Sequence, residues 1–429
     1  MRRFDWRLGL SRETWAWASY DFANSVFATT IIAGFFPVFL DQYWRGDLSH
    51  GQAFALLAWV NAGVAIVIAL CVPVLGAIAD CGNHRKRFLA GFLALGVAAS
   101  ALLALPDKGN LDAALILFGL GSLGFLAGNV FYDALLPHVA PRPHFDRAST
   151  LGYALGYLGG GILFAINVTM VQKPEWFGLV DAGAAVKASF VTVAVWWGLF
   201  ALVLFAGVHE GGGAAGLRRA VGQGLLQFRR IVLRLRTLPL LLGFLVVYWL
   251  YIDGVNSVFK LAVGFGLAVG LPSSGLIVAL LVTQFVAFPA ALAYGWIGER
   301  VGPRAAISAG LLVYIFVVVY AAFITRIWQF FLLAVLVGLV QGGVQALSRS
   351  LYARLIPREE SAAFFGFFGL MGKFAAVFGP LIVAGVQTWT GSPRLAVAAI
   401  GVLFVIGLAG LWMLPLGRAA MNAKAGSGA

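Results

Sequence analysis

Two pairs of polar side chains are candidates for chemistry, because each lies inside a long apolar stretch. Asp21 and Asn24 are three positions apart, and Asp253 and Asn256 repeat that spacing 232 positions later. The seven-residue segments that begin at Asp21 and Asp253 share five identical residues. A carboxylate at the centre of a membrane-spanning helix costs about 2.5–3.5 kcal/mol on insertion scales. A repeated feature of that cost indicates a function or a specific structural need.

Residues three apart share one face of a helix, so each pair would present a carboxylate and an amide together. The carboxylate could bind a charged group of a solute, or take up and release a proton in each transport cycle. The alternative is that both pairs only fix helix packing through hydrogen bonds. Lys260 follows the second pair, whereas Ala28 stands at the equivalent position after the first. We therefore expect the second copy to be the better solute or proton site, and the first to belong partly to a gate.

Other polar residues inside apolar stretches extend this set. The pairs Asn129/Asp133 and Gln341/Gln345 are spaced by four, and each could contact a solute or bond a neighbouring helix. Lys373 lies deep in its stretch, where a lysine needs a partner or water. Lys260 could instead extend to the membrane surface. The predicted solute- or ion-binding residues are Asp21, Asn24, Asn129, Asp133, Asp253, Asn256, Lys260, Gln341, Gln345 and Lys373.

No catalytic or metal-binding motif accompanies these residues. The sequence contains no phosphate-binding Walker loop, no Cys/His metal spacing and no Gly-x-Ser-x-Gly nucleophile turn. Its two cysteines, Cys71 and Cys81, suggest no disulfide framework. We therefore expect no enzyme activity, no cofactor and no metal. The energy for transport would come from an ion gradient or from the gradient of the solute itself.

The elements that position these residues are membrane helices. Of the 429 residues, 61% are hydrophobic and 11% are charged, whereas soluble domains carry about 25% charged residues. Apolar stretches of membrane-spanning length recur from end to end. We predict an all-α integral membrane protein with about twelve spans, at 14–40, 53–79, 88–105, 111–136, 148–171, 186–208, 239–264, 273–294, 304–324, 327–347, 362–386 and 394–416.

The net charge of +13 reflects membrane topology and not nucleic-acid binding. Most Lys and Arg residues fall in the loops on one side of the predicted spans, and positively charged loops face the cytoplasm. The loops on the other side carry only Arg45, Lys108, Lys173, Lys187, Arg326 and Arg394. We expect a multi-pass protein of the inner (plasma) membrane with both termini in the cytoplasm, acting as a monomer.

The predicted spans divide into six and six. The N-terminal bundle would cover 1–208 and the C-terminal bundle 239–429, with the cytoplasmic linker 209–238 between them. The linker begins with His209 and Glu210 before three glycines, a composition typical of a flexible connection. Apolar residues then recur at helical spacing opposite several arginines, which predicts a basic amphipathic helix on the inner leaflet.

A second repeat lies in the loops after the second helix of each half. Gly76, Asp80 and Arg85 in the first loop recur as Gly295, Glu299 and Arg304 in the second. These loops resemble the signature loops of the major facilitator superfamily, which implies that they form a cytoplasmic gate. Asn83 departs from that pattern, since a glycine is usual there; we expect only a local change, because Asn tolerates left-handed backbone. We assign Arg349 to the same gate.

Four further segments narrow the resemblance: Trp15–Thr30, Gly152–Gly161, Gln345–Ser350 and Gly372–Pro380. Together with the loops, they resemble the autophagy-related vacuolar amino-acid effluxer family and its bacterial relatives. The resemblance covers nearly the whole chain. It implies amino-acid export for the fungal members and says little about the substrate of bacterial relatives.

We therefore expect a secondary active transporter that moves a small polar or zwitterionic solute by alternating access, with proton coupling and efflux. Its partners would be that solute, a coupling ion and the lipid bilayer. Two alternatives remain. One is export of a lipophilic or amphipathic compound, and the other is a membrane scaffold of the same fold that transports nothing.

Overall fold

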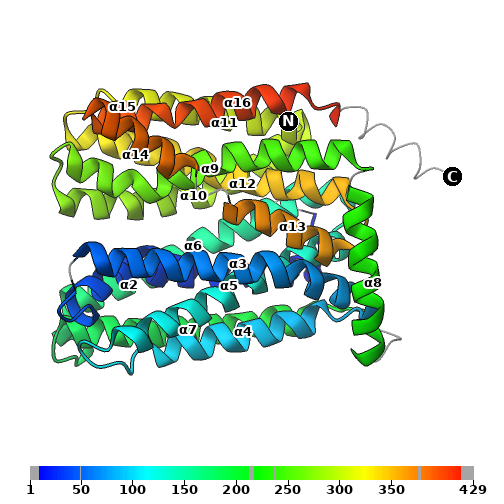
Figure 1. Cartoon of the computed structure of the whole chain (residues 1–429), viewed down its shortest axis with the longest axis horizontal. Helices are drawn as coiled ribbons and strands as arrows, with labels where there is room; N and C mark the ends of the chain where they lie inside the picture. Colours follow the sequence, from blue (N-terminus) through cyan, green and yellow to red (C-terminus); the bar gives the residue numbers. More distant parts are fainter. Residues whose placement is uncertain (1–8, 49, 212–216, 236, 375–377, 417–429) are drawn as a thin grey trace. The chain divides into compact units, whose positions relative to one another are not determined.

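A computed structural model describes residues 9–48, 50–211, 217–235, 237–374 and 378–416. These residues form helices joined by short turns, and no strand occurs among them (Figure 1). The chain forms two compact units. Unit 1 contains Met1–Pro141, Leu151–Leu225 and Glu360–Phe367, and unit 2 contains Arg142–Thr150, Leu226–Glu359 and Phe368–Ala429.

The two units exchange short segments. Residues Arg142–Thr150 come from the first half of the sequence but belong to unit 2, and Glu360–Phe367 come from the second half but belong to unit 1. The predicted division into 1–208, 209–238 and 239–429 contains no such exchange. Each exchanged segment includes the start of a helix, so each unit holds one helix end from the other half of the sequence.

The first half of the sequence supplies seven α-helices and several shorter turns of helix. Side chains cap the starts of three of them. Ser11 Oγ accepts the amide of Thr14 at 3.1 Å, and Asn110 and Asp181 play the same role for the helices that begin at Leu111 and Ala182. The elements are α1 (Arg12–Val26), η1 (Phe27–Phe35), α2 (Phe36–Phe39), η2 (Leu40–Trp44), α3 (His50–Gly82), α4 (Arg85–Leu102), α5 (Leu111–Val139), η3 (Arg142–His144), α6 (Phe145–Gln172), η4 (Pro174–Phe177) and α7 (Ala182–Gly207).

The second half begins with the linker helix and continues in long apolar helices. Proline stands at the start of α11 and α15, where its missing N–H costs no helical hydrogen bond. The elements are α8 (Leu217–Leu235), α9 (Pro239–Ala268), α10 (Ser273–Val301), α11 (Pro303–Ala321), α12 (Ile327–Leu355), α13 (Ser361–Phe374), α14 (Phe378–Thr390), α15 (Pro393–Ala399) and α16 (Gly401–Met413).

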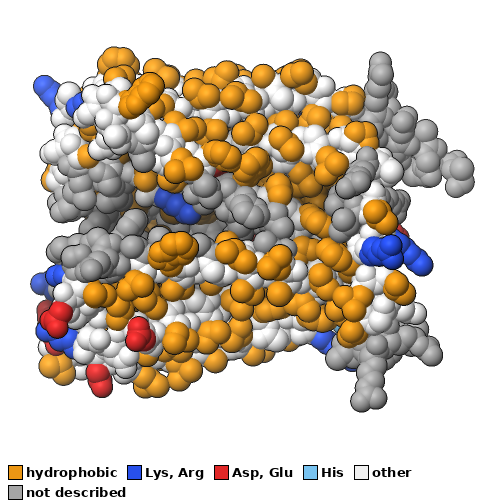
Figure 2. Space-filling model, viewed as in Figure 1, with side chains coloured by type: hydrophobic (Ala, Val, Ile, Leu, Met, Phe, Trp, Pro, Cys, Tyr) orange, Lys and Arg blue, Asp and Glu red, His pale blue; other side chains and the backbone are white. Residues whose placement is uncertain are grey.

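The helices agree with the predicted membrane spans. Ten of them, within the part of the chain that is described, are long and apolar enough to cross a bilayer. The two remaining predicted spans correspond to α4, which opens with three charged residues, and to α13 with α14, which are each shorter than 18 residues. On the face shown in Figure 2, apolar side chains cover the helices, and most charged side chains lie near helix ends. The prediction of an all-α membrane protein is confirmed.

The first span contains a feature that the sequence pattern did not predict. Directly after α1, the chain forms a π-helix of nine residues, Phe27–Phe35, and a second one follows at Leu40–Trp44. π-Helices are rare, usually a single turn long, and frequent at functional sites. The repeated segment that begins at Asp21 therefore ends where the helix changes its winding.

Candidate functional site

The first Asp–Asn pair meets polar residues of α5 inside unit 1. Tyr132 donates its hydroxyl to Asp21 Oδ2 at 2.9 Å, and Asn24 Nδ2 donates to Asn129 Oδ1 at 2.5 Å. Asn24 is fully buried, whereas Asp21, Asn129 and Asp133 are half-buried. The packing of α1 on α5 thus brings together the predicted residues Asp21, Asn24 and Asn129, and the predicted residue Asp133 lies one turn further along α5 than Asn129. We call these four residues with Tyr132 the Asp21 cluster.

Buried aromatic rings hold this cluster in place. The ring of Trp17 stacks on that of Tyr132 at 4.6 Å, and Tyr20 lies 5.0 Å from Tyr132. Trp17 also donates its indole N–H to the carbonyl of Tyr132 at 2.8 Å. All three rings are buried, so they fix the hydroxyl that binds Asp21 and do not themselves form an open surface.

Helix α6 approaches the same part of α1 closely. A Cβ atom at Gly159 would lie 2.3 Å from the carbonyl oxygen of Phe22, so a larger residue would displace α1. Glycine is required here by the close approach of the two helices, as is common in membrane proteins.

The second Asp–Asn pair has different surroundings inside unit 2. Asp253 is 1% exposed and accepts the amides of Phe378 at 2.8 Å and Gly379 at 3.1 Å, the first residues of α14. Ser257 Oγ also donates to it at 3.3 Å. A carboxylate in this place satisfies otherwise unpaired N–H groups and complements the positive end of the helix dipole. The second carboxylate is therefore engaged in holding the start of α14.

The remaining predicted binding residues belong to the second half of the chain. Asn256 is half-buried and Lys260 is exposed on α9. On α12, Gln345 is half-buried and Gln341 is buried, with no hydrogen-bond partner for its Oε1 among the described residues. The side chain of Lys373 lies outside the described residues. Their roles in binding stay predictions.

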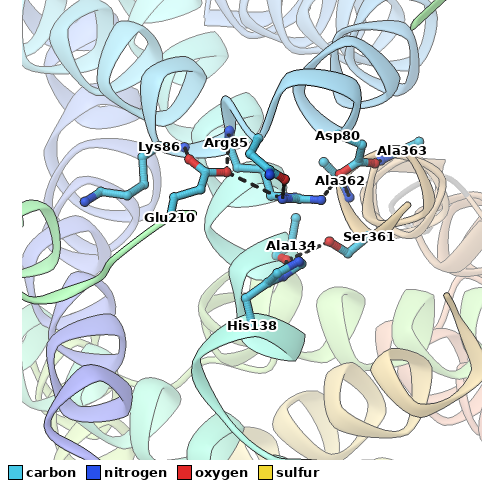
Figure 3. Close-up of polar contacts among 10 residues, drawn as sticks. Asp80, Arg85, Lys86, Ala134, His138, Glu210, Ser361, Ala362 and Ala363 are labelled. Carbon is cyan, nitrogen blue, oxygen red and sulfur yellow. Dashed lines mark hydrogen bonds and ion pairs between the residues drawn. The ribbon is translucent and has the colours of Figure 1, made fainter. Parts of the chain in front are cut away.

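The first predicted gate loop binds the start of α13 within unit 1 (Figure 3). The carboxylate of Asp80 accepts the amides of Ala362 at 3.1 Å and Ala363 at 2.9 Å, and Arg85 Nη2 lies 2.6 Å from it. At Gly76, a Cβ atom would lie 2.5 Å from the carbonyl oxygen of Ala362. The predicted residues Gly76, Asp80 and Arg85 thus act together at this contact. We call these three residues the Asp80 latch.

The turn that joins α3 to α4 carries the expected departure from the glycine pattern. Asn83 has a φ of 49° and is the only non-glycine residue with positive φ among those described. Its side-chain oxygen accepts a hydrogen bond from Arg85 Nη1 at 3.2 Å. The prediction that Asn83 tolerates left-handed backbone at this place is confirmed.

Glu210 contributes to this turn, although the sequence suggested a flexible connection from 209 onward. Its carboxylate accepts the amides of Arg85 at 2.9 Å and Lys86 at 3.0 Å, and it lies 3.5 Å from the Arg85 guanidinium (Figure 3). Lys86 Nζ donates to the carbonyls of Phe205 and Val208 at the end of α7. The connection therefore begins with an ordered cap on α4. Only the acidic residue before the glycines could have indicated it.

The second predicted gate loop binds the start of α6 within unit 2. Glu299 lies 2.5 Å from Arg147 Nη2 and 3.6 Å from His144 Nδ1, so it binds side chains where Asp80 binds backbone amides. A Cβ atom at Gly295 would lie 2.2 Å from Thr150 Oγ1. Arg304 lies over the ring of Trp412 at 4.4 Å and donates to its carbonyl oxygen, a role unlike that of Arg85.

Asp146 is a functional candidate that the sequence reasoning missed. It is 1% exposed, lies 2.8 Å from Arg354 Nη2 and accepts the hydroxyl of Ser350. Next to it, the predicted gate residue Arg349 is 2% exposed and donates to both the hydroxyl and the carbonyl oxygen of Ser149 at 2.8 Å. An acid in the otherwise basic segment before the predicted span 148–171 was the available signal.

Comparisons with known proteins identify the family and the fold of this chain. The chain matches the family described as "Vacuole effluxer Atg22 like" over residues 50–148 and 143–424. It is 35% identical to the uncharacterized MFS-type transporter YxiO of Bacillus subtilis, over 93% of this chain and 94% of that protein.

Two solved structures show the same fold at low sequence identity. The human organic anion transporter MFSD10 is 16% identical with a TM-score of 0.69, over 94% of this chain and 99% of that one. The proton:xylose symporter XylE is 13% identical with a TM-score of 0.69, over 94% of both chains. These matches confirm the predicted major facilitator fold and the predicted family. The chain therefore belongs to the Atg22-like family of major facilitator superfamily transporters and is not an enzyme.

Proposed function

We propose that this transporter moves a small polar or zwitterionic, amino-acid-like solute across the plasma membrane by alternating access, as a proton-coupled exporter. The Asp21 cluster carries the proposal. It places a half-buried carboxylate, two amides and a hydroxyl together in the first membrane helix and its neighbour α5. The first copy of the repeated motif is thus the proposed site, because the second carboxylate already holds the start of α14.

The cluster suits an ammonium group or a proton. A carboxylate has about four acceptor sites, so Asp21 can hold the Tyr132 hydroxyl together with a further donor. Ionisable side chains within membrane-spanning segments commonly mark the path of a solute or a proton. A solute amino group and a proton can each bind a carboxylate in turn, and exchange between the two would couple their movements.

The latches support alternating access. In unit 1, Asp80 holds the start of α13. In unit 2, Glu299 of α10 binds Arg147 at the start of α6, and Asp146 of α6 binds Arg354 of α12. Each contact joins segments from opposite halves of the sequence through a few hydrogen bonds and ion pairs. Such contacts can break and form again as the two halves move, which alternating access requires.

Four further observations support the proposed direction, coupling, location and orientation. The name of the family describes vacuole effluxers, and a structural neighbour is described as a proton symporter. A bacterial relative at 35% identity supports a plasma-membrane location. The distribution of Lys and Arg among the loops supports cytoplasmic termini.

Export of a lipophilic compound is a second candidate, and one cavity favours it. Apolar side chains of unit 2, such as Phe265, Leu280 and Phe330, line a cavity of about 60 Å³ between its helices. That volume holds only a small apolar group, so the polar Asp21 cluster supports the first candidate better.

A binding experiment tests the proposed site. Purified protein would be heated with each member of a panel of amino acids, and a ligand that binds the folded state raises the apparent melting temperature. We expect at least one amino acid to do so, and Asp21→Asn to abolish the shift. Asp112→Asn, which alters an exposed carboxylate on α5, should keep it. An undiminished shift in Asp21→Asn would exclude the cluster as the binding site.

A further inference from the structure

The linker helix α8 carries exposed apolar side chains next to arginines. Its 19 residues include five arginines and no acidic residue. Four large apolar side chains on it are exposed: Val221 (40%), Leu225 (53%), Leu226 (60%) and Leu233 (57%). Arg229 and Arg230 are exposed beside them. We call these six residues the α8 surface.

The spacing of these residues matches a helix that lies in a membrane surface. Val221, Leu225, Arg229 and Leu233 follow one another at intervals of four, so they form one row along α8. Apolar side chains in such a row enter the boundary between headgroups and acyl chains, and arginines reach the phosphates. Because α8 contains five arginines and no acidic residue, it would attract an anionic surface, and no side chain on it would repel that surface.

The linker also contacts the Asp80 latch at two places within unit 1. Glu210, seven residues before α8, binds the amides of Arg85 and Lys86. Further along, a Cβ atom at Gly224 would lie 2.6 Å from the Cα atom of Ile78, so α8 packs directly on α3 two residues before Asp80. A movement of α8 would therefore be transmitted to the Asp80 latch through two contacts, one at Glu210 and one at Gly224.

We propose that the α8 surface binds the anionic phospholipids of the leaflet beside it, and that this binding holds the Asp80 latch closed. The transporter would then respond to the charge of its membrane. This inference is independent of the Asp21 cluster, since it concerns neither the solute nor the proton.

An environment-sensitive fluorophore tests the binding. In full-length protein with Cys71→Ser and Cys81→Ser, Leu225→Cys would carry the label, and Asp107→Cys at an exposed position outside α8 would be the control. The two vesicle types would be phosphatidylcholine alone and phosphatidylcholine with roughly one third phosphatidylglycerol. We expect blue-shifted emission at position 225 only in the anionic vesicles, no shift at 107, and reversal by high salt.

Charge variants provide the matched comparison. The pair Arg229→Gln and Arg230→Gln should abolish the blue shift. The pair Arg87→Gln and Arg142→Gln removes the same charge from exposed positions outside α8 and should preserve it. All four arginines are exposed. Elution of each double variant from a sizing column would verify that it folds. Equal emission at position 225 in both vesicle types would overturn the proposal and leave an acidic protein partner as the occupant to seek.

The effect on the latch is measured at Cys81, the neighbour of Asp80. In a Cys71→Ser background, we expect a membrane-impermeant maleimide to label Cys81 about twofold or more slowly in anionic than in neutral vesicles. Arg229→Gln with Arg230→Gln, or Glu210→Gln alone, should remove that difference. Equal labelling rates of the otherwise unaltered protein in both vesicle types would overturn the coupling to the latch.

Discussion

The two copies of the repeated motif show how one residue type takes different roles in different surroundings. Asp21 binds a phenol hydroxyl and remains half-buried, whereas Asp253 is buried and binds two backbone amides. The sequence analysis favoured the second copy, because Lys260 follows it. The decisive difference comes from α14, whose start lies 125 positions after Asp253. No local pattern contains that information.

Stability measurements should separate the two roles. Asp253→Ala removes the acceptor for the first amides of α14 and should lower the free energy of unfolding by about 1–2 kcal/mol. Asp253→Asn keeps an acceptor oxygen and should cost much less. Thermal unfolding of the purified variants measures both. Equal melting temperatures for Asp253→Ala and the unaltered protein would argue against the capping role.

At the scale of elements, the lengths of the apolar stretches predicted the helices. They did not predict which helices pack against one another. The twelve expected spans agree with the helices because membrane thickness fixes the length of an apolar stretch. The π-helix at Phe27–Phe35 was not predicted, since its side chains resemble those of any apolar helix. Asp146 and Glu210 were missed because their partners lie more than 120 positions away in sequence.

The Asp80 latch makes an element-scale prediction. Asp80→Ala leaves the first amides of α13 without their acceptor and the buried Arg85 guanidinium without its closest carboxylate. We expect the start of α13 to separate from α3 and Cys81 to react several-fold faster with a maleimide. Asp112→Ala, at an exposed position, is the control and should not change the rate. An unaltered rate in Asp80→Ala would show that the carboxylate does not hold α13.

At the scale of the whole molecule, the repeat within the sequence already indicated a two-part transporter. The repeated loops and the repeated Asp–Asn pair pointed to the major facilitator fold, and the matched family and structures confirm it. The exchange of Arg142–Thr150 and Glu360–Phe367 between the units was not predictable, because it depends on tertiary packing at helix ends. These exchanged segments contain the partners of Asp80 and Glu299, which the sequence could not identify.

The central claim is that Asp21, and not Asp253, is the solute or proton site. The most direct test compares Asp21→Asn with Asp253→Asn in proteoliposomes, with a pH gradient driving transport of the amino acid that stabilises the protein most. Asp21→Asn should lose transport by at least about tenfold, since a neutral amide neither releases a proton nor pairs with an ammonium group. Asp253→Asn should retain most of it, because an amide oxygen still accepts the α14 amides. The reverse order of activities would contradict the account.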